Sequence, residues 1–357
     1  MSEPVADFLW LENLVSRYFP LKDSFIQFNI PTFILDSDAE TKKSFLKLYW
    51  ELRKYNYLPV LRRVKGEIVL KVVRYPSKRK RSPLIFWILF IATLLTIIYS
   101  GWLQLSSPAL DLVDPHRNIW LNVFLYVFCF MMVAGLHELG HKVLCIYHGV
   151  ESTLPYFIPG PPQIGGTMGA VIIQESPVVN RDQLFDVGLS GPIFGFFASI
   201  FVTILGVKLS YVLPPYSIPI GSYLPTPIIF DFIVSIFKPM PPNSILLLHP
   251  VAFAGWIGFL LTFLNIMPIA QLDGGHVSRA IFGEKKHKLI SYIAIFILFI
   301  TGFFFMAILA LAMLSYRRHP GPLDDVSSLS MSRKIFGLIV LPTIIALTFV
   351  TFFPSLI

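Results

Sequence analysis

The most conspicuous shortage in this 357-residue sequence is charge, because only 14% of the residues are Asp, Glu, Lys or Arg. An ordinary soluble domain has about 25%. The low charge, together with the high apolar content described below, excludes a disordered, collagen-like or coiled-coil chain. A soluble globular protein is nearly excluded as well.

Cysteine is also scarce. The two cysteines, Cys129 and Cys145, fall in one apolar segment. Their separation on a helix is about 24 Å, which is too far for a disulfide. The first 30 residues contain Glu3, Asp7 and Glu12 and lack a long apolar stretch. We therefore expect neither a disulfide framework nor a cleaved signal or transit peptide.

Apolar residues are abundant, since 55% of the chain is hydrophobic and the mean hydropathy is +0.68. Runs long enough to cross ~30 Å of hydrocarbon recur along residues 83–357. We expect six membrane spans, at about 84–105, 119–147, 184–212, 246–268, 289–315 and 335–353. The fifth is read as one tilted helix, with a hairpin broken near Gly302 as the alternative. The predicted fold class is an α-helical polytopic membrane protein.

The charge that is present gathers in residues 1–82. These hold 16 of the 29 basic and 9 of the 21 acidic residues, a net charge of +7, and the remainder carries +1. The cluster Lys78–Arg81 directly precedes the first span, which favours a cytoplasmic location for residues 1–82 and contact with anionic lipid. We expect no nucleic-acid partner, because no aromatic–basic interleaving or finger spacing accompanies the cluster.

Residues 1–82 also have the pattern of a small α+β domain. A helix is expected over Asp7–Tyr18, a strand over Ser24–Leu35, and a second helix from the N-cap candidate Ser37 to about Tyr55. A hairpin is expected around Lys65-Gly66. This part has no clustered His or Cys, so we expect the chemistry to lie in residues 83–357, the predicted transmembrane domain.

The second span contains His137-Glu138-Leu139-Gly140-His141. Residues i and i+4 share one face of a helix, so both imidazoles can bind one Zn²⁺ ion. Glu138 can then act as the general base toward a zinc-activated water. The alternative is coincidence, which three ionisable groups in an apolar span make improbable.

A hydrolytic zinc site needs a third protein ligand and one open position. The candidate is Asp273, which follows Pro268 and precedes Gly274 and Gly275 at the end of the fourth span. Pro268 ends a helix, and the glycines allow close backbone approach. The alternative is an exposed Asp in a turn. His276 is expected beside the ligands or at the membrane interface, and not among the ligands, because a fourth protein ligand would close the site.

HELGH in one span, with Asn265-Ile-Met-Pro and Leu272-Asp-Gly-Gly at a later one, resembles the site-2 protease family of intramembrane zinc metalloproteases. Further segments resemble the branch that includes plant chloroplast members and their archaeal and bacterial relatives. These segments are Gly166–Ala170, Asn180–Asp186, Ser190–Pro192, Ala254–Trp256 and Pro322–Val326.

The resemblance implies cleavage of a membrane-spanning protein substrate, with one zinc ion per chain. His137, His141 and Asp273 match the family's zinc ligands, and Glu138 matches its general base. Asn265 matches an Asn that helps to polarise the scissile carbonyl or to hold the site. The chain has Asn265-Ile-Met-Pro where Asn-Pro-x-Pro is commoner, which affects the local backbone.

The segment 160–174 suggests how a substrate is held. Its glycines and the following Ala170-Val-Ile-Ile predict a turn and a strand. A strand edge formed around Gly166, Thr167, Met168 and Gly169 could pair with an unwound substrate by β-addition. The alternative is a plain loop packed between spans.

Two other functions stay open. One is a non-proteolytic pseudoenzyme or chaperone-like binder on the same fold, although it would not need the full set of zinc ligands and base. The other is a transporter, which would place polar residues along several spans. We expect a multi-pass protein, in the plasma membrane of a prokaryote. The substrate's identity and the oligomeric state are not encoded in any recognisable pattern.

Overall fold

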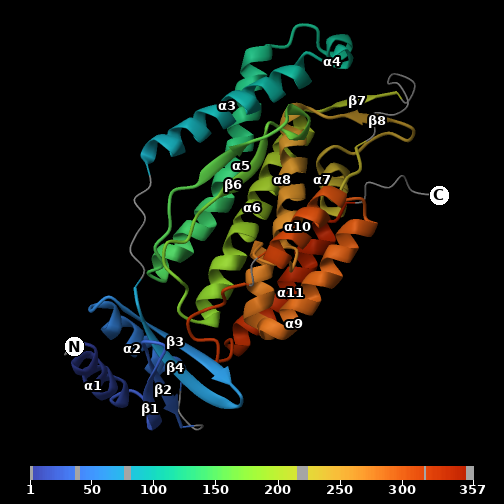
Figure 1. Ribbon diagram of the computed structural model, residues 1–357. Coiled ribbons are helices and arrows are strands. Elements are labelled where there is room, and N and C mark those ends of the chain that lie inside the picture. The colour runs from blue at the N-terminus through green and yellow to red at the C-terminus, as the bar shows by residue number, and fades with distance from the viewer. Residues whose placement is uncertain (1–2, 37–40, 76–81, 215–223, 317–318, 351–357) are drawn as a thin grey trace.

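A computed structural model describes residues 3–36, 41–75, 82–214, 224–316 and 319–350. It is mostly helical, and a small β-rich unit lies at one end of a long helical body (Figure 1). The predicted fold class is confirmed. The basic cluster Lys78–Arg81 and the N-cap candidate Ser37 lie outside the described residues.

The N-terminal unit contains two helices and a four-stranded antiparallel sheet of order β1-β2-β4-β3. Its elements are α1 (Glu3–Ser16), β1 (Leu21–Gln27), β2 (Ile30–Leu35), α2 (Thr41–Arg53), β3 (Tyr57–Val64) and β4 (Glu67–Arg74). Phe33, Phe45 and Leu61 are fully buried in its core. The expected strand 24–35 is in fact a hairpin, because Phe28 and Asn29 take positive φ angles and reverse the chain.

The helical body is built around α6. Its helices are α3 (Pro83–Leu105), α4 (Pro108–Val113), α5 (Ile119–Tyr147), α6 (Arg181–Leu209), α7 (Ile228–Phe237), α8 (Pro250–Ile266), α9 (Asp273–Ile300), α10 (Phe304–Tyr316) and α11 (Met331–Thr348). Two short antiparallel sheets of two strands each flank them, β5 (Tyr156–Pro159) with β6 (Thr167–Val171), and β7 (Tyr211–Leu213) with β8 (Ile245–Leu247). A single 3₁₀ turn, Pro162–Ile164, joins β5 to β6.

Helix α6 packs against α5, α8 and α9 (Figure 1). Small residues permit this close packing, because a Cβ at Gly206 would lie 2.1 Å from the Ala252 amide nitrogen on α8. On the α8 side, a Cβ at Gly258 would lie 2.2 Å from the Ser199 hydroxyl of α6. Glycine at such positions is typical of helices that associate within a bilayer.

Within the described residues, four helices are long and apolar enough to cross a membrane by themselves: α3, α5, α6 and α11. They occupy intervals in which the sequence predicts spans. Helix α8, in the interval 246–268, has 17 residues and is therefore only about 26 Å long. Prolines mark both ends of this helix. Pro250 is its first residue, where proline is tolerated, and the helix ends before Pro268, because proline lacks the backbone N–H that would continue it.

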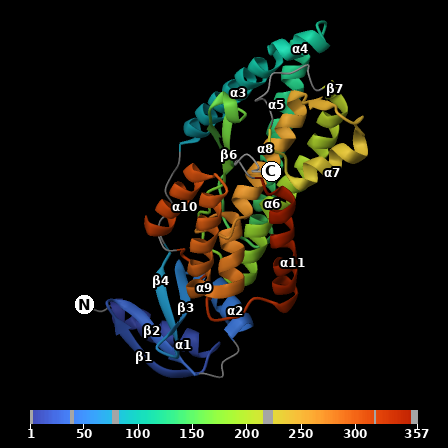
Figure 2. The ribbon, with the colours of Figure 1, turned by 90° about the vertical axis from the view of Figure 1, so that its right-hand side faces the viewer.

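The interval 289–315 is not one helix, so the preferred interpretation of that span was wrong. Helix α9 ends at Ile300, Gly302 takes a φ of +90°, and α10 begins at Phe304 and packs against α9 (Figure 2). The break returns the chain to the end of the molecule that carries the N-terminal sheet. Arg333 therefore lies beside Asp182 at the start of α6, 3.4 Å away, and not at the opposite end.

The N-terminal sheet continues into the helical body through backbone hydrogen bonds. The Leu61 amide of β3 donates to the Leu323 carbonyl over 2.9 Å. The Leu323 and Asp324 amides in turn donate to the carbonyls of Val178 and Val179, over 2.9 and 2.8 Å. Both pairings are parallel. A segment after α10 is thus inserted between β3 and the chain that enters α6.

Candidate metal centre

Helix α5 presents two buried histidines to the centre of the body. His137 and His141 lie four residues apart, are 8% and 5% exposed, and bring their Nε2 atoms to 3.3 Å from each other. The helix continues through both residues, so the i, i+4 spacing places them on one face.

Asp273 meets them from α9, of which it is the first residue. Its Oδ2 lies 3.1 Å from His137 Nε2 and 3.3 Å from His141 Nε2. The turn before it is very tight, since a Cβ at Gly274 would lie 1.8 Å from the Ile266 carbonyl oxygen and one at Gly275 would lie 2.5 Å from that of Ala270. The two glycines therefore allow the backbone approach that brings Asp273 to the histidines.

These three side chains form a group that could hold a metal ion, with all ligand atoms within 4.8 Å of one another. Ligands about 2.0–2.1 Å from a tetrahedral zinc ion lie about 3.3 Å apart, which matches the three distances between these atoms. Two imidazoles and one carboxylate are a donor set that zinc accepts with one position left open. The residues present therefore fit a catalytic zinc ion.

Helix α6 orients one ligand and leaves space at the centre. The Nδ1 atom of His141 lies 2.7 Å from the Val187 carbonyl oxygen, so it donates its proton there and leaves Nε2 free to bind metal. A Cβ at Gly191 would lie 2.1 Å from His141 Nε2, and one at Gly195 would lie 2.9 Å from His137 Nδ1. Only glycine at these two positions lets α6 lie so close to the histidines.

Glu138 and Asn265 lie at the edge of the group. Glu138 is 4% exposed, and its carboxylate interacts with the backbone of Ile172, directly after β6. Asn265, near the end of α8, places Nδ2 3.5 Å from His137 Nε2. The structure thus brings the five residues expected to carry chemistry together from α5, α8 and α9.

The segment expected to bind substrate forms strand β6, which begins at Thr167, earlier than the predicted Ala170. It pairs antiparallel with β5. Thr96 of α3 donates to the Gly166 carbonyl over 2.6 Å, and Met168 is 47% exposed. Gly166 and Gly169 both take positive φ angles. The segment is therefore a defined strand beside α3 and α5 and not an irregular loop.

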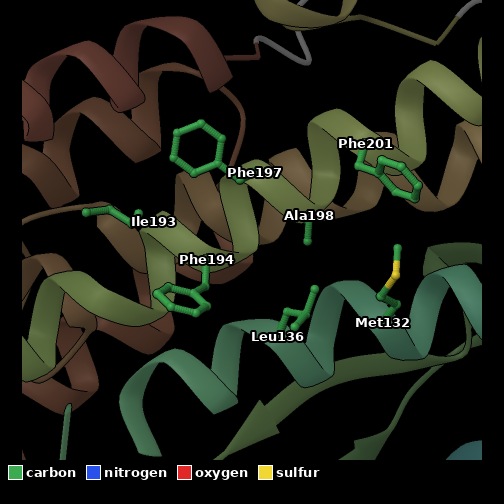
Figure 3. A pocket seen from close by; sticks show the side chains of 7 residues that line it. All are labelled: Met132, Leu136, Ile193, Phe194, Phe197, Ala198 and Phe201. Carbon is green, nitrogen blue, oxygen red and sulfur yellow. The ribbon is translucent and has the colours of Figure 1, made fainter. Parts of the chain in front are cut away.

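An apolar groove of about 380 Å³ lies between α5 and α6 (Figure 3). Its lining is Met132, Leu136, Ile193, Phe194, Phe197, Ala198 and Phe201. Figure 3 shows Leu136 pointing from α5 toward Ala198 on α6, and Met132 pointing toward Phe201 on the same helix. The lining offers no histidine, carboxylate or cysteine, so the groove is not the candidate zinc site.

The sequence does not predict two of the contacts at the centre. The Val187 carbonyl has no sequence signal, because any residue supplies one. His276 lies one turn after Asp273, the first of the two positions expected for it, and the sequence does not indicate its partner: its Nδ1 is 2.8 Å from His319 Nε2, in the segment after α10. Burial lowers the pKa of His319 to about 2, so this imidazole is neutral at physiological pH.

Comparison with known proteins agrees with this centre. The chain is 28% identical over 227 residues to the probable zinc metalloprotease EGY2, chloroplastic, of Oryza sativa subsp. japonica, covering 58% of this chain and 40% of that protein. It is 26% identical over 202 residues to the probable zinc metalloprotease EGY1, chloroplastic, of Arabidopsis thaliana, covering 51% and 32%.

The chain thus spans well under half the length of these relatives, and no solved structure gives a significant match. The family model described as peptidase family M50 matches residues 125–309, which include the histidines of α5 and the Asp273 turn. With more than half of its length matched, the chain belongs to peptidase family M50, the site-2 protease family.

Proposed function

We propose that this chain is an intramembrane zinc metallopeptidase that cleaves a peptide bond within or near the transmembrane segment of a membrane-protein substrate. The observation that carries the proposal is the His137, His141 and Asp273 group, set in helices of a multi-pass membrane protein. The family assignment and the relatives' description as zinc metalloproteases support zinc as the metal.

The three ligands would hold one zinc ion per chain. When bound, zinc acts as a Lewis acid that polarises water and the scissile carbonyl. Glu138 accepts the proton of the attacking water and returns it to the leaving amine. The Asn265 amide, beside His137, donates a hydrogen bond to the developing oxyanion or steadies the ligand.

Strand β6 offers a way to present the substrate. A transmembrane helix protects its amides by internal hydrogen bonds, so it must unwind before attack. An unwound stretch that added to β6 at Gly166, Thr167, Met168 and Gly169 would lie near Glu138, because Glu138 interacts with the backbone at Ile172. The substrate would then reach the general base as an extended chain.

The membrane orientation is part of the proposal. Residues 1–82 form a domain on the cytoplasmic side, and residues 83–357 form the metallopeptidase domain. The return of the chain after α10 supports this orientation, because it puts Arg333 at the same end as the N-terminal sheet. The relatives are chloroplast proteins, so they lend no support to a prokaryotic plasma membrane.

The decisive test is Glu138→Gln in the purified, detergent-solubilised protein. With a reporter transmembrane substrate, we expect cleavage to fall by at least about 100-fold, the contribution of a general base, while zinc content stays at one per chain. Glu67→Gln, an exposed change in β4, is the matched control and should retain activity. Cleavage by Glu138→Gln at the wild-type rate would refute the mechanism. A wild-type protein that binds zinc and substrate without cleavage would indicate a non-proteolytic binder.

A further inference from the structure

Two arginines from different helices bind the carboxylate of Asp325. Arg279 of α9 donates from Nη1 to Oδ1 over 3.0 Å and from Nη2 to Oδ2 over 2.6 Å. Arg181 of α6 donates from Nε to Oδ1 over 3.2 Å. The Arg279 side chain is 2% exposed and that of Asp325 12%. Bidentate pairing between Arg279 and Asp325 fixes the relative orientation of the two side chains in addition to neutralising their charges.

Each arginine belongs to a segment that positions a metal ligand. Arg279 follows Asp273 by six residues on α9, before the kink at Gly283. Arg181 is the first residue of α6, six residues before Val187, whose carbonyl orients His141. A movement of Asp325 would therefore shift the helix that carries Asp273 and the helix that orients His141.

The segment that carries Asp325, residues 319–330, is here called the strap. Near Arg279 it lies very close to α9, because a Cβ at Gly321 would stand 2.8 Å from Arg279 Nη2, and Gly321 takes a φ of +65°. His319 of the strap also contacts His276, on the first turn of α9. The strap is thus fitted to the ligand-bearing end of α9.

The same strap closes the edge of the N-terminal sheet. The Leu61 amide donates to the Leu323 carbonyl, and Arg62 Nη1 donates to that carbonyl over 2.6 Å. Leu323 is buried in the core of the N-terminal unit. The Asp325 amide also donates to the Leu61 carbonyl over 3.3 Å, so the residue that pairs with Arg279 of α9 itself contacts β3.

We infer that Asp325 is a positioning residue, through which the edge of the N-terminal sheet sets the geometry of the His137, His141 and Asp273 group. Displacing β3 from the strap would loosen Asp325 and so the two helices that it joins. Conversely, a metal ion that fixes the three ligands would tighten the strap on β3, because coupling between two sites is reciprocal. The inference rests on the proposed function only in that the three residues bind zinc.

The first test perturbs the contact between the strap and β3. Arg62→Met keeps the side-chain stem and removes the hydrogen bond to Leu323. We expect the zinc dissociation constant, measured by competition with a chromophoric chelator, to rise about 5- to 10-fold, within the usual range of coupling between sites. Lys22→Met is the matched control, since its exposed ion pair with Glu67 does not contact the strap, and it should leave the constant unchanged.

The second test removes the ion pair between the strap and α9. Arg279→Met together with Asp325→Leu avoids leaving the fully buried Arg279 without a partner. Arg181 loses the Asp325 carboxylate, but it is 19% exposed and keeps its 2.9 Å hydrogen bond to the Asp325 backbone carbonyl. We expect zinc affinity to fall about 10- to 100-fold, as for groups that support metal ligands. Arg117→Met with Asp111→Leu is the control, because Arg117 is nearly as buried as Arg279 and its partner Asp111, on α4, does not contact the strap.

Hydrogen exchange provides the reciprocal measurement. Zinc should slow hydrogen exchange of the Leu61 amide in the wild-type protein. We expect this factor to be about as large as the factor by which Arg62→Met raises the zinc dissociation constant. If folded Arg62→Met binds zinc as tightly as wild type, or if zinc leaves Leu61 exchange unchanged, the inference is wrong, even where the double variant fails to fold. Neither readout uses cleavage, so loss of the proposed peptidase activity would leave this result interpretable.

Discussion

Replacing Gly191 by alanine tests whether metal binding requires the absence of a side chain at this position of α6. A Cβ there would lie 2.1 Å from His141 Nε2, whereas a carbon and a nitrogen in van der Waals contact lie about 3.5 Å apart. Either the imidazole or α6 must move by more than about 1 Å. A zinc ligand tolerates only about 0.2 Å of displacement.

The expected magnitude follows from the loss of one ligand. Changes that merely disturb the support of a zinc ligand reduce affinity about 10- to 100-fold, so we expect Gly191→Ala to reduce zinc affinity by at least about 100-fold. That is a cost of about 2.7 kcal/mol or more. Alanine itself favours helix over glycine by about 1 kcal/mol, so intrinsic helix propensity does not explain a loss.

The assay is zinc competition with a chromophoric chelator, together with thermal unfolding of the metal-free protein to verify the fold. Gly135→Ala is the matched control, because Gly135 lies on α5 near the same histidines and a Cβ there meets nothing within 4 Å. It should bind zinc like the wild type. If Gly191→Ala bound zinc within threefold of wild type, the placement of α6 against His141 would be refuted.

Three further predictions concern the metal and its turn. Removing zinc with a chelator should abolish cleavage of a transmembrane reporter, and adding zinc back should restore it, as followed by gel analysis; persistent cleavage without metal would contradict the proposal. Asp273→Asn should reduce zinc affinity by at least about 10-fold, because a neutral amide replaces the only charged ligand of the group; an unchanged chelator titration would exclude Asp273 as a ligand. Gly274→Ala should destabilise the protein by about 2 kcal/mol or more, since its Cβ would lie 1.8 Å from the Ile266 carbonyl oxygen, and an unshifted melting temperature would contradict the tight turn.

The sequence predicted the membrane class, and it predicted that His137 and His141 share one helical face, as they do in the structure. Hydropathy depends on composition alone, so long apolar runs such as Pro83–Leu105 are visible without any tertiary information. The spacing of His137 and His141 needs only the geometry of one helix. Both predictions rest on properties that neighbouring elements do not change.

Predictions of chain reversal were weaker. The strand expected over Ser24–Leu35 is a hairpin at Phe28-Asn29, whose turn lacks glycine and proline. The expected span 289–315 breaks at Gly302, where α10 packs back against α9. In both places a turn lay within a run that was taken for one element, because hydropathy does not distinguish one long element from two short ones.

The sequence by itself thus determined an apolar, multi-pass chain with two histidines on one helical face and an Asp beside two glycines. Only the tertiary structure decided that the Asp meets the histidines, since 132 residues separate His141 from Asp273 along the chain. It also decided that Val187 orients His141 and that Asp325 joins α6 to α9. Local spacing is fixed by helix geometry, whereas these contacts depend on how several helices pack, which no single segment encodes.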